Sequence, residues 1–260
     1  NTIVTTHRRQ VCYGVMGAGI RGLCVGIAED SPLRTHKNAE LAAVCDFRSR
    51  QLDRIRSAAG ENVKLYTDVA DFLQHPGLEA VYVATPDQAH YENALQVLRA
   101  GKHLLLEKPM ARTTAHCDEM LRVWEGTGLV FEVFLELRFC NFFEKVKEIL
   151  DTGVLGKLVL ADVIDNIAPG GRYFFHKYFR RRETGISLVL QKGCHTLDLA
   201  NWFIASSPRS VYAWNGLAKF GGDRPVGLHC SGCGEKTTCR DFVESQLVYN
   251  GTTMIQEDTC

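Results

Sequence analysis

The stretch GAGIRG at residues 17–22 decides the fold, because it follows an apolar run at residues 11–16 and opens a segment of helical periodicity. In such a turn between strand and helix, the first glycine permits the tight turn and the second admits a pyrophosphate close to the backbone. The third glycine lets the helix pack against the strand. The stretch therefore predicts dinucleotide binding, with contacts from Gly17, Gly19, Ile20, Arg21 and Gly22.

Outward from this turn, short apolar runs alternate with segments of helical periodicity up to about residue 135. This alternation is typical of strand–helix–strand units, whose right-handed crossovers give a parallel sheet covered on both faces. We therefore predict an α/β domain with a doubly wound Rossmann sheet over residues 1–135. Its expected strands are residues 11–16, 41–45, 64–66, 80–84, 103–107 and 129–135, and its expected helices are residues 19–28, 49–59, 68–75, 90–100 and 113–124.

The sequence pattern changes after residue 136, where the apolar runs lengthen and Asn250-Gly251 gives a strong hairpin signal. We predict that residues 136–260 form a C-terminal α+β domain with a mostly antiparallel open sheet. Its expected helices are residues 141–150 and 196–203, and its expected strands are residues 157–166, 210–214, 242–249 and 252–256.

The composition bounds the class of protein. Of 260 residues, 45% are hydrophobic and 23% are charged, which excludes a wholly disordered chain. The 30 basic residues balance the 30 acidic ones, so no overall field attracts nucleic acid or an anionic membrane. No apolar run approaches the roughly 18 residues of a membrane span, and no export signal is visible. We expect a cytoplasmic enzyme that binds neither nucleic acid nor membrane.

Two further features bear on the dinucleotide. Asp46 ends the second strand, 24 residues beyond Gly22 and near the roughly 20 that the motif predicts, where a carboxylate accepts hydrogen bonds from ribose hydroxyls. This favours NAD, although Arg48 could meet a 2′-phosphate and make NADP possible. The alternative is that Asp46 caps the following helix.

The ends of two later strands carry polar groups. Thr85-Pro86 follows the strand at 80–84, and Glu107-Lys108-Pro109 ends the strand at 103–107. Ligands of open α/β sheets bind at the carboxyl ends of the strands, so Lys108 is well placed to act on a substrate hydroxyl or carbonyl. The alternative is an ordinary surface lysine.

These motifs resemble those of the Gfo/Idh/MocA family, the glucose–fructose oxidoreductase and inositol dehydrogenase-like group. Gly101-Lys102-His103 before Glu-Lys-Pro, and Gly193-Cys194-His195 followed by Asp198, complete the resemblance, which runs from about residue 11 to 249. It implies an NAD(P)-dependent oxidoreductase that transfers hydride between nicotinamide and a sugar, inositol or related polyol hydroxyl. It also implies that Thr85, Pro86, His90, Glu107 and Lys108 contact the cofactor.

The resemblance implies that Lys108 and His195 are catalytic, with His195 as general base. One position departs from the family pattern, because Gln191 stands one turn before His195 where an acid is usual. Two alternatives therefore stay open: an NAD-dependent glycosidase that works by transient oxidation and elimination, and a non-catalytic dinucleotide-binding regulator. The expected substrate-binding residues are Arg138, Tyr173, His176, Lys177, Gln191 and Asp198.

The substrate residues include three from a basic, aromatic stretch at 170–182. Interleaved basic and aromatic side chains also occur in RNA-binding segments, but the zero net charge argues against RNA. Relatives of this family usually run well past 300 residues, so we expect the second domain to lack its last strands. An open sheet needs cover, which favours a homodimer or homotetramer.

Ten cysteines are present, most of them in apolar runs where a free thiol packs as a small hydrophobe. Cys230, Cys233 and Cys239 form a separate cluster with one C-x-x-C spacing, which suits tetrahedral zinc but supplies three of the four sulfur ligands. Free thiols, a structural zinc site and a disulfide all stay open. No catalytic metal is predicted.

Overall fold

The computed structural model describes residues 10–166, 187–216, 232–239 and 242. The chain divides into two compact units, residues 1–136 and 137–260, which are described separately below. The basic, aromatic stretch at 170–182 and the hairpin predicted around Asn250-Gly251 lie outside the described residues.

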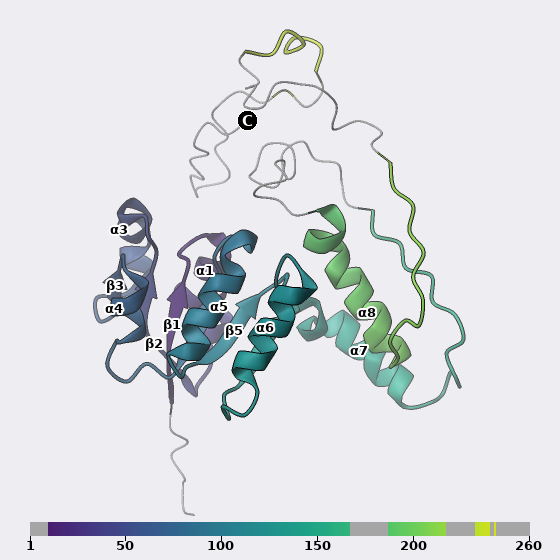
Figure 1. The fold of residues 1–260 in the computed structure, drawn as a ribbon, viewed down its shortest axis with the longest axis horizontal. Helices are drawn as coiled ribbons and strands as arrows, with labels where there is room; N and C mark the ends of the chain where they lie inside the picture. Colours follow the sequence, from purple (N-terminus) through teal and green to yellow (C-terminus); the bar gives the residue numbers. More distant parts are fainter. Residues whose placement is uncertain (1–9, 167–186, 217–231, 240–241, 243–260) are drawn as a thin grey trace, which may run out of the picture. The chain divides into compact units, whose positions relative to one another are not determined.

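The first unit contains a six-stranded sheet in the order β3-β2-β1-β4-β5-β6. Every neighbouring pair of strands is parallel. This order is that of the doubly wound dinucleotide-binding sheet, with its switch point between β1 and β4. The predicted α/β Rossmann sheet is therefore confirmed (Figure 1). The strands are β1 (Val11–Met16), β2 (Ala39–Cys45), β3 (Lys64–Tyr66), β4 (Ala80–Val83), β5 (His103–Glu107) and β6 (Phe131–Phe134).

Both faces of the sheet are buried, because alternate residues of each strand enter different apolar layers. In β4, Val81 and Val83 belong to one layer and Tyr82 to the other. The first layer packs against α4 (Val69–Leu73), α5 (His90–Arg99) and α6 (Thr114–Trp124), of which α5 and α6 lie side by side. The second layer packs against the helical segment after β1 and against α3 (Ser49–Ala59).

The helices of the first unit begin and end as local chemistry predicts. The side chain of Asp68 accepts a hydrogen bond from the amide of Asp71 (3.0 Å), which caps α4. Thr113 caps α6 in the same way through the amide of His116 (3.2 Å). Gly101 follows the C-cap residue of α5 and has φ 70°, a left-handed conformation that favours glycine. Two short helices complete the unit, α2 (Pro32–Thr35) and the 3₁₀ turn η2 (Asp87–Ala89).

The helix predicted at residues 19–28 is present, but it is not a regular α-helix throughout. It begins as α1 (Ile20–Gly22) and continues as a π-helical turn, η1 (Leu23–Ile27). Gly26 in this turn has no room for a side chain, because an added Cβ would lie 2.8 Å from a methyl of Val15. Hydrophobic periodicity cannot distinguish such a turn from regular α-helix over so few residues.

The regular elements in the described part of the second unit are helical. It contains α7 (Asn141–Asp151), the π-helical turn η6 (Val189–Gly193) and α8 (Cys194–Ile204), preceded by the 3₁₀ turn η3 (Glu136–Phe139). The rings of Phe143 in α7 and Phe203 in α8 lie 6.3 Å apart. None of the helices in the described ranges combines the length and apolar character that crossing a bilayer requires.

Two strands predicted for the second unit are wrong. Residues 157–166 and 210–214 adopt no regular secondary structure. Most of their apolar side chains are exposed, with Val159 at 88% and Trp214 at 91%. A strand needs a neighbour for its backbone hydrogen bonds, and neither segment pairs with another described segment. Apolar composition alone therefore misassigned them, and the predicted antiparallel sheet stays a prediction.

Candidate functional site

The glycine turn lies at the switch point of the sheet. Gly17 has φ 100°, and an added Cβ would lie 2.6 Å from the carbonyl oxygen of Ala84, which follows β4. At Gly22 an added Cβ would lie 1.9 Å from the carbonyl oxygen of Gly17. An added Cβ at Gly19, in contrast, meets nothing within 4 Å. The first and third glycines are thus required by the fold, whereas the second borders open space where a pyrophosphate could approach.

Two side chains from other elements hold the backbone of this turn. Asp46, at the end of β2, accepts the amide hydrogen of Ala18 through Oδ2 (3.0 Å). Gln51 of α3 donates to the carbonyl oxygen of Ala18 (2.5 Å). Both backbone groups of one residue are therefore fixed by side chains, which pre-forms the turn before any ligand binds.

Asp46 also pairs with the residue predicted to modulate NADP binding. Its Oδ1 accepts from the amide of Arg48 (3.0 Å) and from the guanidinium Nε (3.2 Å). The N-cap position of α3 is Arg48, so Asp46 is not the cap of that helix. The Arg48 guanidinium also lies 5.3 Å from the ring centre of the exposed Phe47. The exposed Ile20 borders the glycine turn itself.

Glu107, at the end of β5, forms the centre of a buried polar cluster. Its Oε1 accepts from the Tyr82 hydroxyl (2.6 Å) and from Nε of Arg21 (2.7 Å). Burial first, and then the Glu107 carboxylate, raise the pKa of Tyr82, so its hydroxyl stays protonated and donates. Arg21 also lies 3.5 Å from Glu136 and 5.9 Å from the ring centre of Phe134. Arg21 thus ties the glycine turn to the strand end that carries Lys108.

The two predicted strand-end segments are joined by His90. Its ring has no exposed surface, with Nδ1 2.7 Å from the carbonyl oxygen of Pro109 and Nε2 2.9 Å from that of Thr85. Lys108 is 9% exposed and Pro86 is exposed. His90 therefore reaches the candidate site through the backbone that it holds, rather than by presenting its ring to a nicotinamide.

In the second unit, the predicted residues gather on one helical segment. Gln191 lies in the π-helical turn η6 and is 4% exposed, and His195 follows in the first turn of α8. The Asp198 carboxylate accepts two hydrogen bonds from Arg138, at 2.8 Å from Nε and 2.6 Å from Nη2. The Arg138 guanidinium lies 5.6 Å from the ring centre of Trp202. Arg138 and Asp198 therefore form a two-bond ion pair that joins η3 to α8.

Both π-helical turns among the described residues coincide with the predicted chemistry. One, η1, follows the glycine turn, and the other, η6, carries Gln191 and leads into His195. Such turns are rare and frequently lie at functional sites, because the extra residue re-aims neighbouring side chains. Each unit thus carries one such turn beside its own predicted residues.

Several predicted residues lie outside the described residues, namely Tyr173, His176, Lys177 and Cys230. The remaining members of the cysteine cluster, Cys233 and Cys239, are partly buried free thiols. Within the described ranges, no three histidine, cysteine or carboxylate side chains lie close enough together to hold a metal ion.

Three site residues were missed by sequence reasoning. Gln51 and Tyr82 contribute hydrogen bonds to residues distant in sequence, for which the chain carries no local signal. Asp87 is 5% exposed, and burial raises its pKa against the opposing charges of His90 and Lys108. Its position directly after Thr85-Pro86 at a strand end is a signal that could have singled it out.

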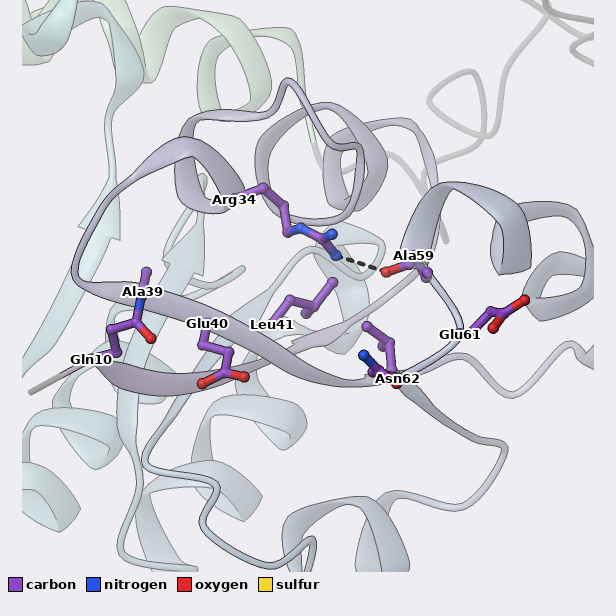
Figure 2. A pocket seen from close by; sticks show the side chains of 10 residues that line it. Gln10, Arg34, Ala39, Glu40, Leu41, Ala59, Glu61 and Asn62 are labelled. Atoms are coloured by element: carbon purple, nitrogen blue, oxygen red, sulfur yellow. Dashed lines mark hydrogen bonds between the residues drawn. The ribbon is translucent and has the colours of Figure 1, made fainter.

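A separate hollow of about 360 Å³ lies at the amino ends of β1, β2 and β3. It is bordered by the start of β2 at Ala39 and the end of α3 at Ala59, whose carbonyl oxygen accepts from Arg34 (2.7 Å; Figure 2). Glu40 and Glu61 also line it. Because ligands of open α/β sheets bind at the carboxyl ends of the strands, this hollow is not the expected dinucleotide site.

Comparison with known proteins agrees with this geometry. Residues 11–135 match the family described as "Oxidoreductase family, NAD-binding Rossmann fold", and residues 143–256 match the "GFO/IDH/MocA C-terminal domain". The chain is 30% identical to inositol 2-dehydrogenase 1 of Saccharopolyspora erythraea, over 74% of this chain and 52% of the relative. It is 30% identical to D-glucoside 3-dehydrogenase of Escherichia coli, over 65% of this chain and 48% of the relative.

A solved structure is similar over most of the chain. Scyllo-inositol dehydrogenase of Lactobacillus casei, with bound NAD(H) and scyllo-inositol, superposes with a TM-score of 0.64 at 25% identity. The match covers 76% of this chain and 57% of that protein. The chain spans about half the length of the curated relatives that it matches.

Proposed function

Because the chain belongs to the Gfo/Idh/MocA oxidoreductase family, we propose that it transfers hydride between a nicotinamide dinucleotide and a hydroxyl group of a sugar, inositol or related polyol. The observation that carries the proposal is the glycine turn. It is rigid at Gly17 and Gly22, open at Gly19, and lies at the switch point of a doubly wound sheet. This combination fits a bound pyrophosphate.

The residues of the turn fit NAD as the preferred cofactor. Asp46 is buried at the end of β2, where a carboxylate accepts hydrogen bonds from ribose hydroxyls and repels a 2′-phosphate. Arg48 is exposed beside it and could draw a 2′-phosphate, so NADP binding is expected to be weaker but measurable. The bound cofactor supplies the site that accepts or gives the hydride.

We assign to His195 the role of accepting the proton of the substrate hydroxyl. A neutral imidazole can accept this proton as the C–H bond breaks, and its ordinary pKa of about 6.5 suits that role near neutral pH. Lys108 is proposed to hold the substrate oxygen electrostatically, which lowers the cost of the developing negative charge. Gln191 can donate or accept a hydrogen bond to a hydroxyl but cannot take its proton, so it is assigned to substrate binding.

The test is a panel of sugars and inositols incubated with NAD and, in parallel, with NADP, with fluorescence detection of the reduced cofactor. We expect reduction with at least one polyol and faster turnover with NAD. Dinucleotide binding without reduction by any polyol would instead favour the non-catalytic regulator.

A second candidate is favoured by Gln191 together with the similarity to D-glucoside 3-dehydrogenase. In such an enzyme, oxidation of a glucoside hydroxyl to a ketone would make the neighbouring C–H acidic, and loss of that proton would expel the aglycone. Addition of water to the resulting double bond and return of the hydride to the ketone would then give hydrolysis without net redox change. Release of nitrophenol from nitrophenyl glycosides, with no added NAD, would support this glycosidase. Absence of release together with polyol-dependent NADH formation would support the dehydrogenase.

The assembly and location of the protein are also proposals. We propose a homodimer or homotetramer, since most soluble oligomers of this kind are symmetric assemblies of identical chains. We propose a cytoplasmic location, which agrees with the free thiols among the described cysteines. Light scattering coupled to size-exclusion chromatography tests the first proposal, and fractionation of the source cells tests the second.

A further inference from the structure

The hydrogen-bond geometry of His90 carries an inference that deepens the proposed function. The ring is fully buried, and each of its two nitrogens lies within hydrogen-bond distance of a backbone carbonyl oxygen. A carbonyl oxygen can accept but never donate, so each contact is a hydrogen bond only if the nitrogen carries a hydrogen. A neutral imidazole carries one such hydrogen, whereas an imidazolium carries two.

The two alternatives, a neutral ring in this orientation and a ring rotated by half a turn, are each unfavourable. In a neutral ring, one nitrogen lone pair would face a carbonyl lone pair at 2.7 or 2.9 Å, and the ring has no exposed surface at which bulk solvent could screen the repulsion. Rotating the ring by half a turn would place carbon atoms against the same oxygens and lose both hydrogen bonds. The geometry therefore favours a ring that donates from both nitrogens.

A buried cation needs a negative charge nearby. Asp87 lies three residues before His90, is 5% exposed, and has one carboxyl oxygen, Oδ2, without a hydrogen-bond partner. Burial raises the pKa of the Asp87 carboxyl, and the positive charges of His90 and then Lys108 oppose this shift by favouring the carboxylate, while Glu107 adds a second negative charge. Asp87 and Glu107 thus supply the negative charge on the η2 and β5 sides of the cluster.

We propose that His90 is held as an imidazolium that ties the turn after β4 to the turn after β5, with Asp87 as its counter-charge, and that this pair positions Lys108. The two carbonyl groups belong to Thr85 and to Pro109, the residue directly after Lys108. His90 and Asp87 are positioning residues, because they act through the backbone that carries Lys108 and through its electrostatic surroundings. The inference rests on the proposed function for its kinetic part alone.

The primary test is spectroscopic and does not depend on turnover. The 260-residue chain, labelled with ¹⁵N at its nine histidines, is studied by two-bond ¹H–¹⁵N correlation at pH 7, and the variant His90→Gln assigns the His90 signals. We expect both ring nitrogens of His90 to resonate as protonated nitrogens. A signal typical of an unprotonated ring nitrogen at His90 would overturn the proposal.

The counter-charge is tested with Asp87→Asn, which keeps the shape of the side chain and removes its charge. We expect His90 to lose one of its two protons and kcat for the best polyol to fall about 10- to 100-fold, with the NAD dissociation constant changed less than about threefold. The matched control is Asp53→Asn, at an exposed aspartate of α3. This substitution should change neither the protonation of His90 nor kcat. A doubly protonated His90 in Asp87→Asn would overturn the role of Asp87.

The two proposals fail separately. If no polyol is oxidised by the unaltered chain, the proposed function fails and the His90 spectrum still decides the inference. If Asp87→Asn does not fold, the spectrum of the unaltered chain decides it. If the chain oxidises a polyol while His90 carries a single proton, the inference alone is wrong.

Discussion

The polar groups of the two units differ in how they are held. In the first unit, Glu107, Lys108, Asp87 and His90 are each less than a tenth exposed and lie at the ends of adjacent parallel strands or in the turns after them. In the described part of the second unit, Gln191 is as buried as these groups at 4% exposed, but His195 is partly exposed and the Arg138 side chain is 39% exposed.

The apolar surroundings differ in the same direction. The first unit buries apolar side chains on both faces of its sheet, whereas Leu199 is the buried apolar residue of the second unit's described part. Buried polar groups cost stability when a partner is removed, but exposed ones are rehydrated by water. Substitutions in the first unit should therefore affect both folding and chemistry, and those in the second should have milder effects on folding.

The largest expected effect is on turnover, from Lys108→Ala. If Lys108 acts as proposed, loss of the cation assigned to the substrate oxygen should lower kcat/KM about 10²- to 10³-fold, while NAD binding stays nearly intact. Steady-state kinetics and NAD titration measure the two quantities, with the exposed Lys64→Ala as control. Near-normal turnover in Lys108→Ala would contradict the assignment of this lysine.

The next effect separates the folding role of the glycine turn from its binding role. Gly22→Ala forces a Cβ against the Gly17 carbonyl and should lower the free energy of unfolding by about 2–4 kcal/mol. Gly19→Ala meets no neighbouring atom and should change stability by less than about 0.5 kcal/mol.

For Gly19→Ala, the loss should instead appear as weaker NAD binding, by about tenfold or more, because the new methyl group occupies the space beside the turn. Urea denaturation and NAD titration of both variants make the comparison. Equal stability losses in the two variants would show that the turn is strained at both positions, contrary to the geometry.

A smaller effect is expected from the ion pair of the second unit. Arg138→Lys cannot reproduce the two-bond contact with Asp198. Because the pair is partly exposed, the free energy of unfolding should fall by about 1 kcal/mol. A double-mutant cycle with Asp198→Asn isolates the interaction. A coupling energy near zero would indicate that the pair contributes nothing measurable to folding.

The smallest expected effect is a difference in thiol reactivity between the two units, which is measured without any substitution. Burial first, and then Asp46 and Asp68, raise the pKa of Cys45 to about 12, so almost no thiolate is present at pH 8. Iodoacetamide should therefore modify the exposed Cys140 of the second unit and spare Cys45 of the first. Mass spectrometry of peptides reads the outcome, and rapid labelling of Cys45 would show that the first unit opens readily.

Local sequence signals predicted the first unit well. The strands β1, β3 and β5 were expected at the positions where the structure has them, and the helices expected from residues 68 and 113 begin next to their observed caps, Asp68 and Thr113. These signals are local, since capping and alternating apolar residues act within a few positions of the chain. In the second unit, residues 157–166 and 210–214 carry strand-like composition without a described partner strand, and the prediction of strands there was wrong.

The sequence by itself determined the glycine turn, the alternation of strand and helix, and hence the family to which the chain belongs. Tertiary structure alone decided that Glu107 meets Arg21, which lies 86 positions earlier, and that Asp46 and Gln51 both hold Ala18. It also decided that both nitrogens of His90 face carbonyl groups. The physical reason is that a hydrogen-bond partner is chosen by proximity in the folded chain, which a short stretch of sequence does not encode.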